Sequence, residues 1–193
     1  IIVDDASTDG SVEIIKKIIG DDPRFILIEN QENKGCGFTK RKTLEYATGE
    51  FCAFLDPDDA ITAEAMELSI SKFTKPSIIG TYSKIMFCDS ELNSLYDFKK
   101  IKQIYNNLYF FNCPIQMNAF FVCRKNAYDK TEGINPNLNS AVDQDLYLKI
   151  LEQGNAIFIP KSMYLYRRHP SGISQDSSKS KAKENFAKVI FEA

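Results

Sequence analysis

Two groups of aspartates, each directly after an apolar run, are the residues of this sequence whose spacing best suits chemistry. The first run ends in Asp4 and Asp5, and the second ends in Asp56, Asp58 and Asp59. Ligands of open α/β sheets bind just outside the carboxyl ends of the strands, so we expect both groups near one such edge. Carboxylates gathered there repel one another unless a cation offsets their charge. A hard divalent ion that prefers oxygen ligands would do so, and it would bring phosphates with it.

The elements that must position these acids alternate between strand and helix in the first part of the chain. Runs of β-branched and aromatic residues predict strands, and apolar residues at helical spacing predict helices. In chain order we predict strand 1–3, helix 11–19, strand 25–29, helix 39–47, strand 50–55 and helix 62–73. Residues 33–37 should form a glycine-containing loop, and Gly49 should end the second helix. This alternation favours a doubly wound, mostly parallel α/β sheet.

The pattern is less regular from residue 78 onward. We predict strands at 78–87 and 119–123, a helix at 143–153, short strands at 156–159 and 162–167, and a helical pattern at 180–193. The stretch 88–117 is left unassigned. No internal repeat or linker divides the chain, so we expect one domain over residues 1–193. The chain starts inside an apolar run and its last helix has no cap, which suggests that both ends are cut.

Composition disfavours several classes of protein. The chain has 24 Lys and Arg against 26 Asp and Glu, so no basic surface recommends a nucleic acid partner. Its five cysteines include no C-x-x-C pair, which favours reduced thiols in the cytosol over a disulfide framework or a zinc site. No apolar stretch approaches the roughly 18–20 residues that span a bilayer. We expect a cytoplasmic protein, with any membrane association peripheral and at the inner face.

A series of motifs, in the same order and spacing, resembles family 2 glycosyltransferases of the GT-A fold. The motifs are IVDDASTDGS (2–11), NKG (33–35), ATGEF (47–51), FLDPDD (54–59), DQDLYLK (143–149) and YRRHPSGIS (166–174). The resemblance implies a Rossmann-like, mostly parallel sheet flanked by helices. Because the family begins with an additional strand and helix, it also implies a domain that lacks its first strand and helix and is truncated at the C-terminus.

The resemblance assigns the two acidic groups to a nucleotide and a metal. Asp5, with Asp4, would accept hydrogen bonds from the base, usually uracil, since carboxylates only accept. Asp56-Pro57-Asp58 is the D-x-D element, which holds the ribose and a divalent cation, Mn²⁺ or Mg²⁺, on the diphosphate. Asp58 is the expected metal contact, and Asp56 contacts the ribose or the metal. The competing interpretation is that both groups are acidic turns, because Asp, Ser, Gly and Pro are common turn residues.

Asp143 occupies the position of the family's general base, which takes a proton from the acceptor hydroxyl. One base without a protein nucleophile implies inversion at the anomeric carbon in a single displacement. The competing interpretation is a helix N-terminus, where an acid such as Asp143 is favoured by the dipole. The family usually has Glu where this chain has Val142, which leaves the register open between Asp143 and Asp145, although Leu146 and Lys149 favour Asp143.

Three basic residues complete the expected site. His169, the one histidine of the sequence, would approach the metal or the diphosphate, unless it is a plain surface histidine. Arg167 or Arg168 would contact a phosphate through a charge-assisted bond. Lys40 would contact the donor where the family usually has Arg, so the charge is kept without the planar fork of a guanidinium.

We therefore expect a glycosyltransferase that moves a sugar from a nucleotide-diphosphate donor, with UDP favoured, to an acceptor hydroxyl with inversion. Its partners would be that donor and a glycan or lipid-linked acceptor, in polysaccharide or cell-envelope glycan synthesis. Acceptor contacts should lie between residues 78 and 140. One alternative is a phosphorylation-receiver domain, which also opens with a strand that ends in two acids and has its phosphoacceptor Asp after a later strand. The other is a sugar-nucleotide-binding protein without turnover.

Overall fold

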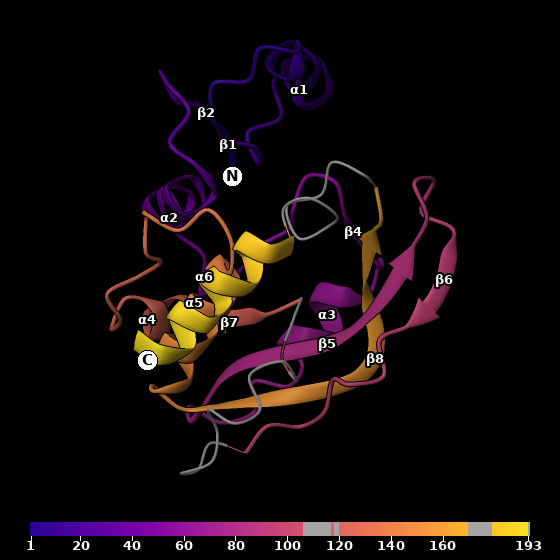
Figure 1. Ribbon diagram of the computed structural model, residues 1–193, viewed down its shortest axis with the longest axis vertical. Coiled ribbons are helices and arrows are strands. Elements are labelled where there is room, and N and C mark those ends of the chain that lie inside the picture. Colours follow the sequence, from indigo (N-terminus) through magenta and orange to yellow (C-terminus); the bar gives the residue numbers. More distant parts are fainter. Residues whose placement is uncertain (106–116, 118–119, 170–178, 193) are drawn as a thin grey trace.

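The structure of this protein is a computed structural model, and it describes residues 1–105, 117, 120–169 and 179–192. In chain order the elements are β1 (Ile2–Asp4), α1 (Ser11–Ile19), β2 (Leu27–Glu29), α2 (Cys36–Glu45), β3 (Phe51–Ala53), β4 (Ala60–Ile61), α3 (Ala65–Ile70), β5 (Ile78–Cys88), β6 (Ser94–Asp97), β7 (Val122–Arg124), α4 (Lys125–Tyr128), α5 (Val142–Leu151), β8 (Asn155–Arg167) and α6 (Lys179–Glu192). Figure 1 shows their arrangement.

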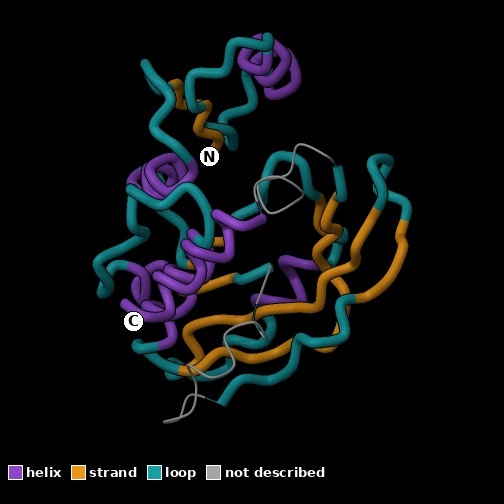
Figure 2. Tube along the Cα trace, in the orientation of Figure 1, coloured by secondary structure: helices purple, strands orange, loops and turns teal. Residues whose placement is uncertain are grey.

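The two longest strands, β5 and β8, form the centre of the main sheet. They pair in parallel, and the order across the sheet is β3-β7-β5-β8-β4, with β6 paired to β5. A separate two-stranded sheet, β1 with β2, is parallel and carries α1. Helices α5 and α6 lie side by side on one face of the main sheet (Figure 2), while α3 packs on β5, β7 and β8. The fold is therefore a layered α/β arrangement, as predicted.

The expectation of a mostly parallel sheet is wrong. Among the described strand pairs, β1–β2 and β5–β8 are parallel, whereas β3–β7, β4–β8, β5–β6 and β5–β7 are antiparallel. The physical reason lies in the connections after residue 78. A short turn joins β5 to β6, and a short turn can join only antiparallel neighbours, since parallel strands need a long crossover.

Several predicted elements shift at their ends. Helix 11–19 is confirmed. The loop predicted at 33–37 is two residues too long, because α2 already begins at Cys36, directly after Gly35, whose φ is +86°. Gly49 does not end this helix; Tyr46 occupies its C-cap position. The two short strands at 156–159 and 162–167 are one strand, β8, in which the register shifts between Ile159 and Ser162. That shift coincides with Pro160, which cannot donate to a strand ladder.

The unassigned stretch 88–117 contains β6, and the predicted strand at 119–123 corresponds to β7, Val122–Arg124. The closing motif is described only as far as His169. Over the described residues, no helix is long and apolar enough to cross a membrane. The described cysteines, Cys36, Cys52, Cys88 and Cys123, are free thiols.

Two apolar cores hold the layers together, one on each side of the main sheet. The larger core joins α5 to β5 and includes Tyr82, Leu146 and Ile150, and the smaller joins α3 to the sheet through Ala65 and Met163. Burial of this apolar surface is the main force that closes the sheet onto the helices. The larger core lies beneath α5, the helix that begins at the expected catalytic base.

Tyr82 is the main polar group inside the larger core, and its side chain is fully buried. The hydroxyl donates to the Lys102 carbonyl at 2.7 Å and accepts from the Ile104 amide at 2.6 Å. These two bonds attach the chain after β6 to the centre of the sheet. Burial raises the pKa of Tyr82 to about 12, which keeps the hydroxyl a donor.

We predict that Tyr82→Phe lowers the free energy of unfolding by about 1–3 kcal/mol, because it leaves the buried Ile104 amide and the Lys102 carbonyl without their partner. Urea unfolding followed by circular dichroism measures the change. Tyr105→Phe is the control, since the Tyr105 side chain is mostly exposed, and it should change stability by less than about 0.5 kcal/mol. Equal losses in both variants would contradict this role of the Tyr82 hydroxyl.

Candidate functional site

Lys40 joins two acids that are far apart in the sequence. Its Nζ atom lies 2.8 Å from Asp56 Oδ1 and 2.9 Å from Asp143 Oδ1. Lys40 projects from α2, Asp56 follows β3, and Asp143 is in the first turn of α5. Only 14% of the Lys40 side chain is exposed, whereas 38% of Asp56 and 44% of Asp143 are exposed. A single, nearly buried ammonium therefore gathers the D-x-D element and the expected base around one site.

The charges of this group depend on one another. Burial lowers the pKa of Lys40, but the carboxylates of Asp143 and Asp56 outweigh it and raise that pKa well above its usual value. The ammonium is therefore permanently charged. Burial raises the pKa of Asp56, and Lys40 opposes that rise, while the nearby Asp143 adds to it. Removal of the positive charge would leave two repelling carboxylates in a partly desolvated place.

The other acids of the second group, Asp58 and Asp59, face the end of β8. Asp58 Oδ2 lies 2.8 Å from Nε2 of His169. Arg167 fixes this segment, because its Nε donates to the Asp58 carbonyl at 2.6 Å and its amide donates to Asp59 Oδ1 at 2.8 Å. The two residues expected at the metal, Asp58 and His169, are therefore adjacent. Arg168 donates its amide to a carbonyl at the end of β5, and over the described residues its guanidinium forms no hydrogen bond or ion pair with the acids.

Asp5 accepts three hydrogen bonds from within the protein. Its carboxylate binds the Asn30 side-chain amide at 2.8 Å, the Lys34 amide at 2.9 Å and the Gly35 amide at 2.8 Å. Burial raises the pKa of Asp5, but these donors outweigh burial and hold it below its usual value. The Thr39 hydroxyl also contributes to the lowered pKa of Asp5. Asp5 therefore orders the start of α2 whether or not a nucleotide is bound.

Asp4 occupies a turn. It is buried, its Oδ2 atom accepts the Ser7 amide at 3.0 Å, and its carbonyl accepts the Asn30 amide at 2.9 Å. These bonds agree with the turn interpretation of the first acidic group. The contacts with a nucleotide base expected from Asp4 and Asp5 stay predictions.

Two residues of the site were missed by sequence reasoning. Asn30 binds Asp5 and also accepts from Lys42 at 2.8 Å, and Tyr164 accepts the Asp56 amide at 3.4 Å. Asn30 could have been found, because it follows β2, the parallel neighbour of the strand that ends in Asp4 and Asp5. Tyr164 carries no such signal, since it lies inside a strand that is remote in the sequence.

The donor atoms present fit a divalent cation that shares its coordination with a ligand. Among the described residues, no group of three or more His, Cys, Asp or Glu side chains could hold a metal ion by itself. Asp58 and His169 offer one carboxylate and one imidazole, and both are partly exposed. Mg²⁺ is commonly bound by one or two carboxylates together with substrate phosphates, which requires no complete protein cage.

Comparison with protein-family models decides the family. The model described as glycosyl transferase family 2 matches residues 1–131, which include both acidic groups and Lys40. The chain belongs to glycosyl transferase family 2. The match ends before Asp143 and His169, so it does not itself assign roles to those two residues.

Curated relatives of this family 2 domain include much longer proteins. A chondroitin synthase of Escherichia coli is 30% identical over the whole chain, which spans 28% of that relative's length. A hyaluronan synthase of Pasteurella multocida is 28% identical over 84% of the chain and 17% of its own length. The chain thus spans less than two thirds of the curated relatives that it matches.

Solved structures confirm the GT-A fold. Staphylococcus aureus TarS 1–349 in complex with UDP-GlcNAc matches with a TM-score of 0.74 at 20% identity, over 97% of this chain and 54% of TarS 1–349. At this identity the likeness is one of fold. Neither the family nor the structural neighbours support the phosphorylation-receiver alternative.

We predict that the contribution of Asp5 to stability depends on acidic pH. Because the folded-state pKa of Asp5 is depressed, its contribution is fully present above the unfolded-state pKa of about 3.9 and is lost as pH falls through the lower folded-state value. The stability difference between wild type and Asp5→Asn should be largest above pH 5 and shrink toward pH 2.5. Urea unfolding at each pH measures it, and a difference that stays constant would contradict the assignment.

Proposed function

We propose that this domain transfers a sugar from a nucleotide-diphosphate donor to an acceptor hydroxyl with inversion. The observation that carries the proposal is the joint contact of Lys40 with Asp56 and Asp143. A donor-binding acid and a base lie around one buried cation, at the place where the family's motifs meet. The family assignment and the GT-A fold support the same reaction.

Asp143 would act as the general base. Its carboxylate lies in the first turn of α5 and is 44% exposed, so an acceptor hydroxyl can approach it from solvent. Lys40 lies 2.9 Å from Oδ1 of this carboxylate and orients it. No nucleophile of the protein is required, so a direct attack by the acceptor oxygen would invert the anomeric carbon.

Asp58 and His169 would hold a divalent cation, Mn²⁺ or Mg²⁺, against the diphosphate, with Asp56 near the ribose. When bound, such an ion supplies charge neutralisation that makes the diphosphate a better leaving group. A mannosyltransferase from Pyrobaculum calidifontis, solved with GDP-Man and Mn²⁺, matches with a TM-score of 0.67 at 16% identity over 98% of this chain and 52% of its own. Lys40 would stabilise the donor's negative charge beside the metal. Arg168 would need to turn its guanidinium toward the phosphates.

UDP is the nucleotide that we propose, because the TarS structure contains UDP-GlcNAc and the family's motifs assign Asp5 to a base that is usually uracil. The acceptor would be a glycan or a lipid-linked saccharide, since chondroitin and hyaluronan synthases are among the relatives. The same relatives support a place in polysaccharide or cell-envelope glycan synthesis. The cytoplasmic location, peripheral at most to the inner face of the membrane, and the single domain over residues 1–193 stay predictions.

We predict that UDP stabilises the protein more in the presence of Mn²⁺ or Mg²⁺ than in excess chelator, because Asp58 and the diphosphate share the ion. Asp58→Asn should remove most of this difference in melting temperature. Asp129→Asn is the matched control, since Asp129 pairs with Lys125 at the end of α4, and it should keep the difference. Equal stabilisation by UDP with and without chelator would rule out the shared ion.

We predict that Asp143→Asn in the full-length protein lowers turnover by roughly 10²-fold or more, the usual scale for loss of a general base. UDP affinity should stay nearly unchanged, because the amide keeps the size of the carboxylate. Release of UDP from a panel of sugar nucleotides, with calorimetric binding of UDP, measures both. Wild-type protein that binds UDP but turns over no donor would favour the non-catalytic binding protein.

A further inference from the structure

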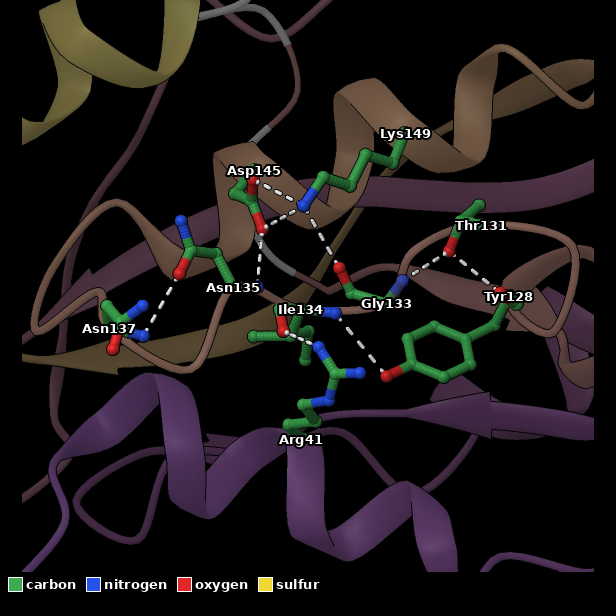
Figure 3. A network of polar contacts seen from close by, with 9 residues as sticks. All are labelled: Arg41, Tyr128, Thr131, Gly133, Ile134, Asn135, Asn137, Asp145 and Lys149. Carbon is green, nitrogen blue, oxygen red and sulfur yellow. Dashed lines mark hydrogen bonds and ion pairs between the residues drawn. The ribbon is translucent and has the colours of Figure 1, made fainter. Parts of the chain in front are cut away.

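Every backbone amide and carbonyl of the segment Gly133–Asn135, whose first two residues are buried, is in a hydrogen bond. Figure 3 draws the bonds that side chains make. Five of the six bonds come from side chains, those of Arg41, Tyr128, Thr131, Asp145 and Lys149. The sixth joins the Asn135 carbonyl to the Leu138 amide at 3.3 Å. Irregular buried backbone must find partners outside a helix or strand. Here those partners converge from α2, α4 and α5.

One ion pair inside this network holds both ends of the segment. The Asp145 carboxylate lies 2.9 and 3.0 Å from Lys149 Nζ and accepts the Asn135 amide at 2.9 Å. Lys149 also donates to the Gly133 carbonyl at 3.0 Å. Asp145 is 8% exposed, and the two side chains lie one helical turn apart on α5. A partly buried charged pair, with 24% of the Lys149 side chain exposed, thus binds two particular backbone groups.

Residues 135–139 make close contact with the start of α2. The Gly37 amide donates to the Leu138 carbonyl at 2.8 Å. A Cβ atom at Gly37 would lie 2.5 Å from the Asn135 carbonyl oxygen, and one at Gly35 would lie 2.2 Å from Asn139 Oδ1. At Gly37 both near neighbours are backbone, so no side chain larger than hydrogen fits there without a backbone shift, whereas at Gly35 the neighbour is the end of the Asn139 side chain. The position of α2's first residues therefore depends on where residues 135–139 are held.

The residues directly before α2 bind Asp5. The amides of Lys34 and of Gly35, the N-cap of α2, donate to the Asp5 carboxylate, and Lys40 lies near the start of that helix. A chain of direct contacts thus runs from the Asp145–Lys149 pair, through residues 133–139, to Gly35 and Asp5. The Asp145–Lys149 pair contacts neither Asp5 nor the proposed general base, Asp143. It instead fixes residues 133–139, which contact the residues that bind Asp5.

We propose that Asp145 and Lys149 are positioning residues for nucleotide binding, which they support by holding residues 133–139 against the start of α2. This inference rests on the proposed function, because it assigns the pair to the same donor site. A buried ion pair is weak support for stability, since apolar residues of similar volume often serve as well. Here the ion pair selects one position of the backbone. Small displacements at a binding site strongly lower affinity and reaction rate.

The experiment uses the full-length protein and measures calorimetric binding of UDP with Mg²⁺, well below the melting temperature. Lys149→Met and Asp145→Asn should each weaken UDP binding about tenfold, while Lys149→Arg, which keeps the cation, should largely restore it. With a sugar-nucleotide donor, KM should rise similarly and kcat should change by less than about threefold. Asp143→Asn should show the opposite pattern, with a lower kcat and nearly unchanged UDP affinity. Should Lys149→Met not fold, Asp145→Asn gives the same test.

Arg124→Met is the matched control for a merely structural effect. Arg124 is also a nearly buried cation that holds backbone carbonyls, those of Ile78 and Phe73, but it lies at the far end of β3 from Asp56. It should lower the melting temperature and leave UDP affinity unchanged. The double variant Asp145→Asn/Lys149→Met should bind UDP no more weakly than either single variant, because both act through one segment.

Two results would overturn the proposal. If Lys149→Met and Asp145→Asn behave like Arg124→Met, with a lower melting temperature and normal UDP affinity, the pair serves stability alone. If the two losses multiply in the double variant, the residues do not act through a common segment. Wild-type protein that binds no nucleoside diphosphate would instead refute the proposed function, and this inference with it.

Discussion

The charge of Lys40 is the interaction on which the site depends. Three segments that share no local structure, α2, the turn after β3 and the start of α5, present charged groups to one nearly buried position. Without the ammonium, the two partly desolvated carboxylates would repel each other, and no ion pair would join the three segments. With the ammonium present, the same charges stabilise the arrangement, so the chemistry of the site and its assembly share one cause.

This dependence explains why the main sheet can be mixed without harm to the site. The acids that matter follow β1 and β3 or begin α5, and each is fixed by its own bonds to a neighbouring segment. Strand β6 pairs with β5 and does not contact these acids. Strand β7 pairs with β3, and its Val122 and Cys123 also complete the cores that support α3 and α5.

The sequence predicts those parts of the fold and site that depend on local pattern. Helix α1, the strands before both acidic groups, and the nearness of Asp58 to His169 follow from periodicity and from the family's motifs. The start of α2 was missed because Gly35 and Gly37 look like loop residues, whereas the structure needs them for close contact with residues 135–139. The parts lost to sequence reasoning are contacts between remote segments, such as Tyr164 with Asp56, which leave no periodic signal.

Helix geometry separates the two acids of Asp143-Gln144-Asp145. Residues two apart on an α-helix point in nearly opposite directions, since each residue turns by about 100°. Asp143 therefore faces Lys40 and solvent, while Asp145 faces Lys149 and the protein interior. The D-x-D pattern of Asp56 and Asp58 lies outside any helix. Asp56 pairs with Lys40, and Asp58 lies beside His169. Equal spacing of like residues thus places two acids at the same proposed ligand site in one case, and in the other separates the proposed base from the proposed positioning residue. The local backbone, which the motif alone does not contain, decides which of the two occurs.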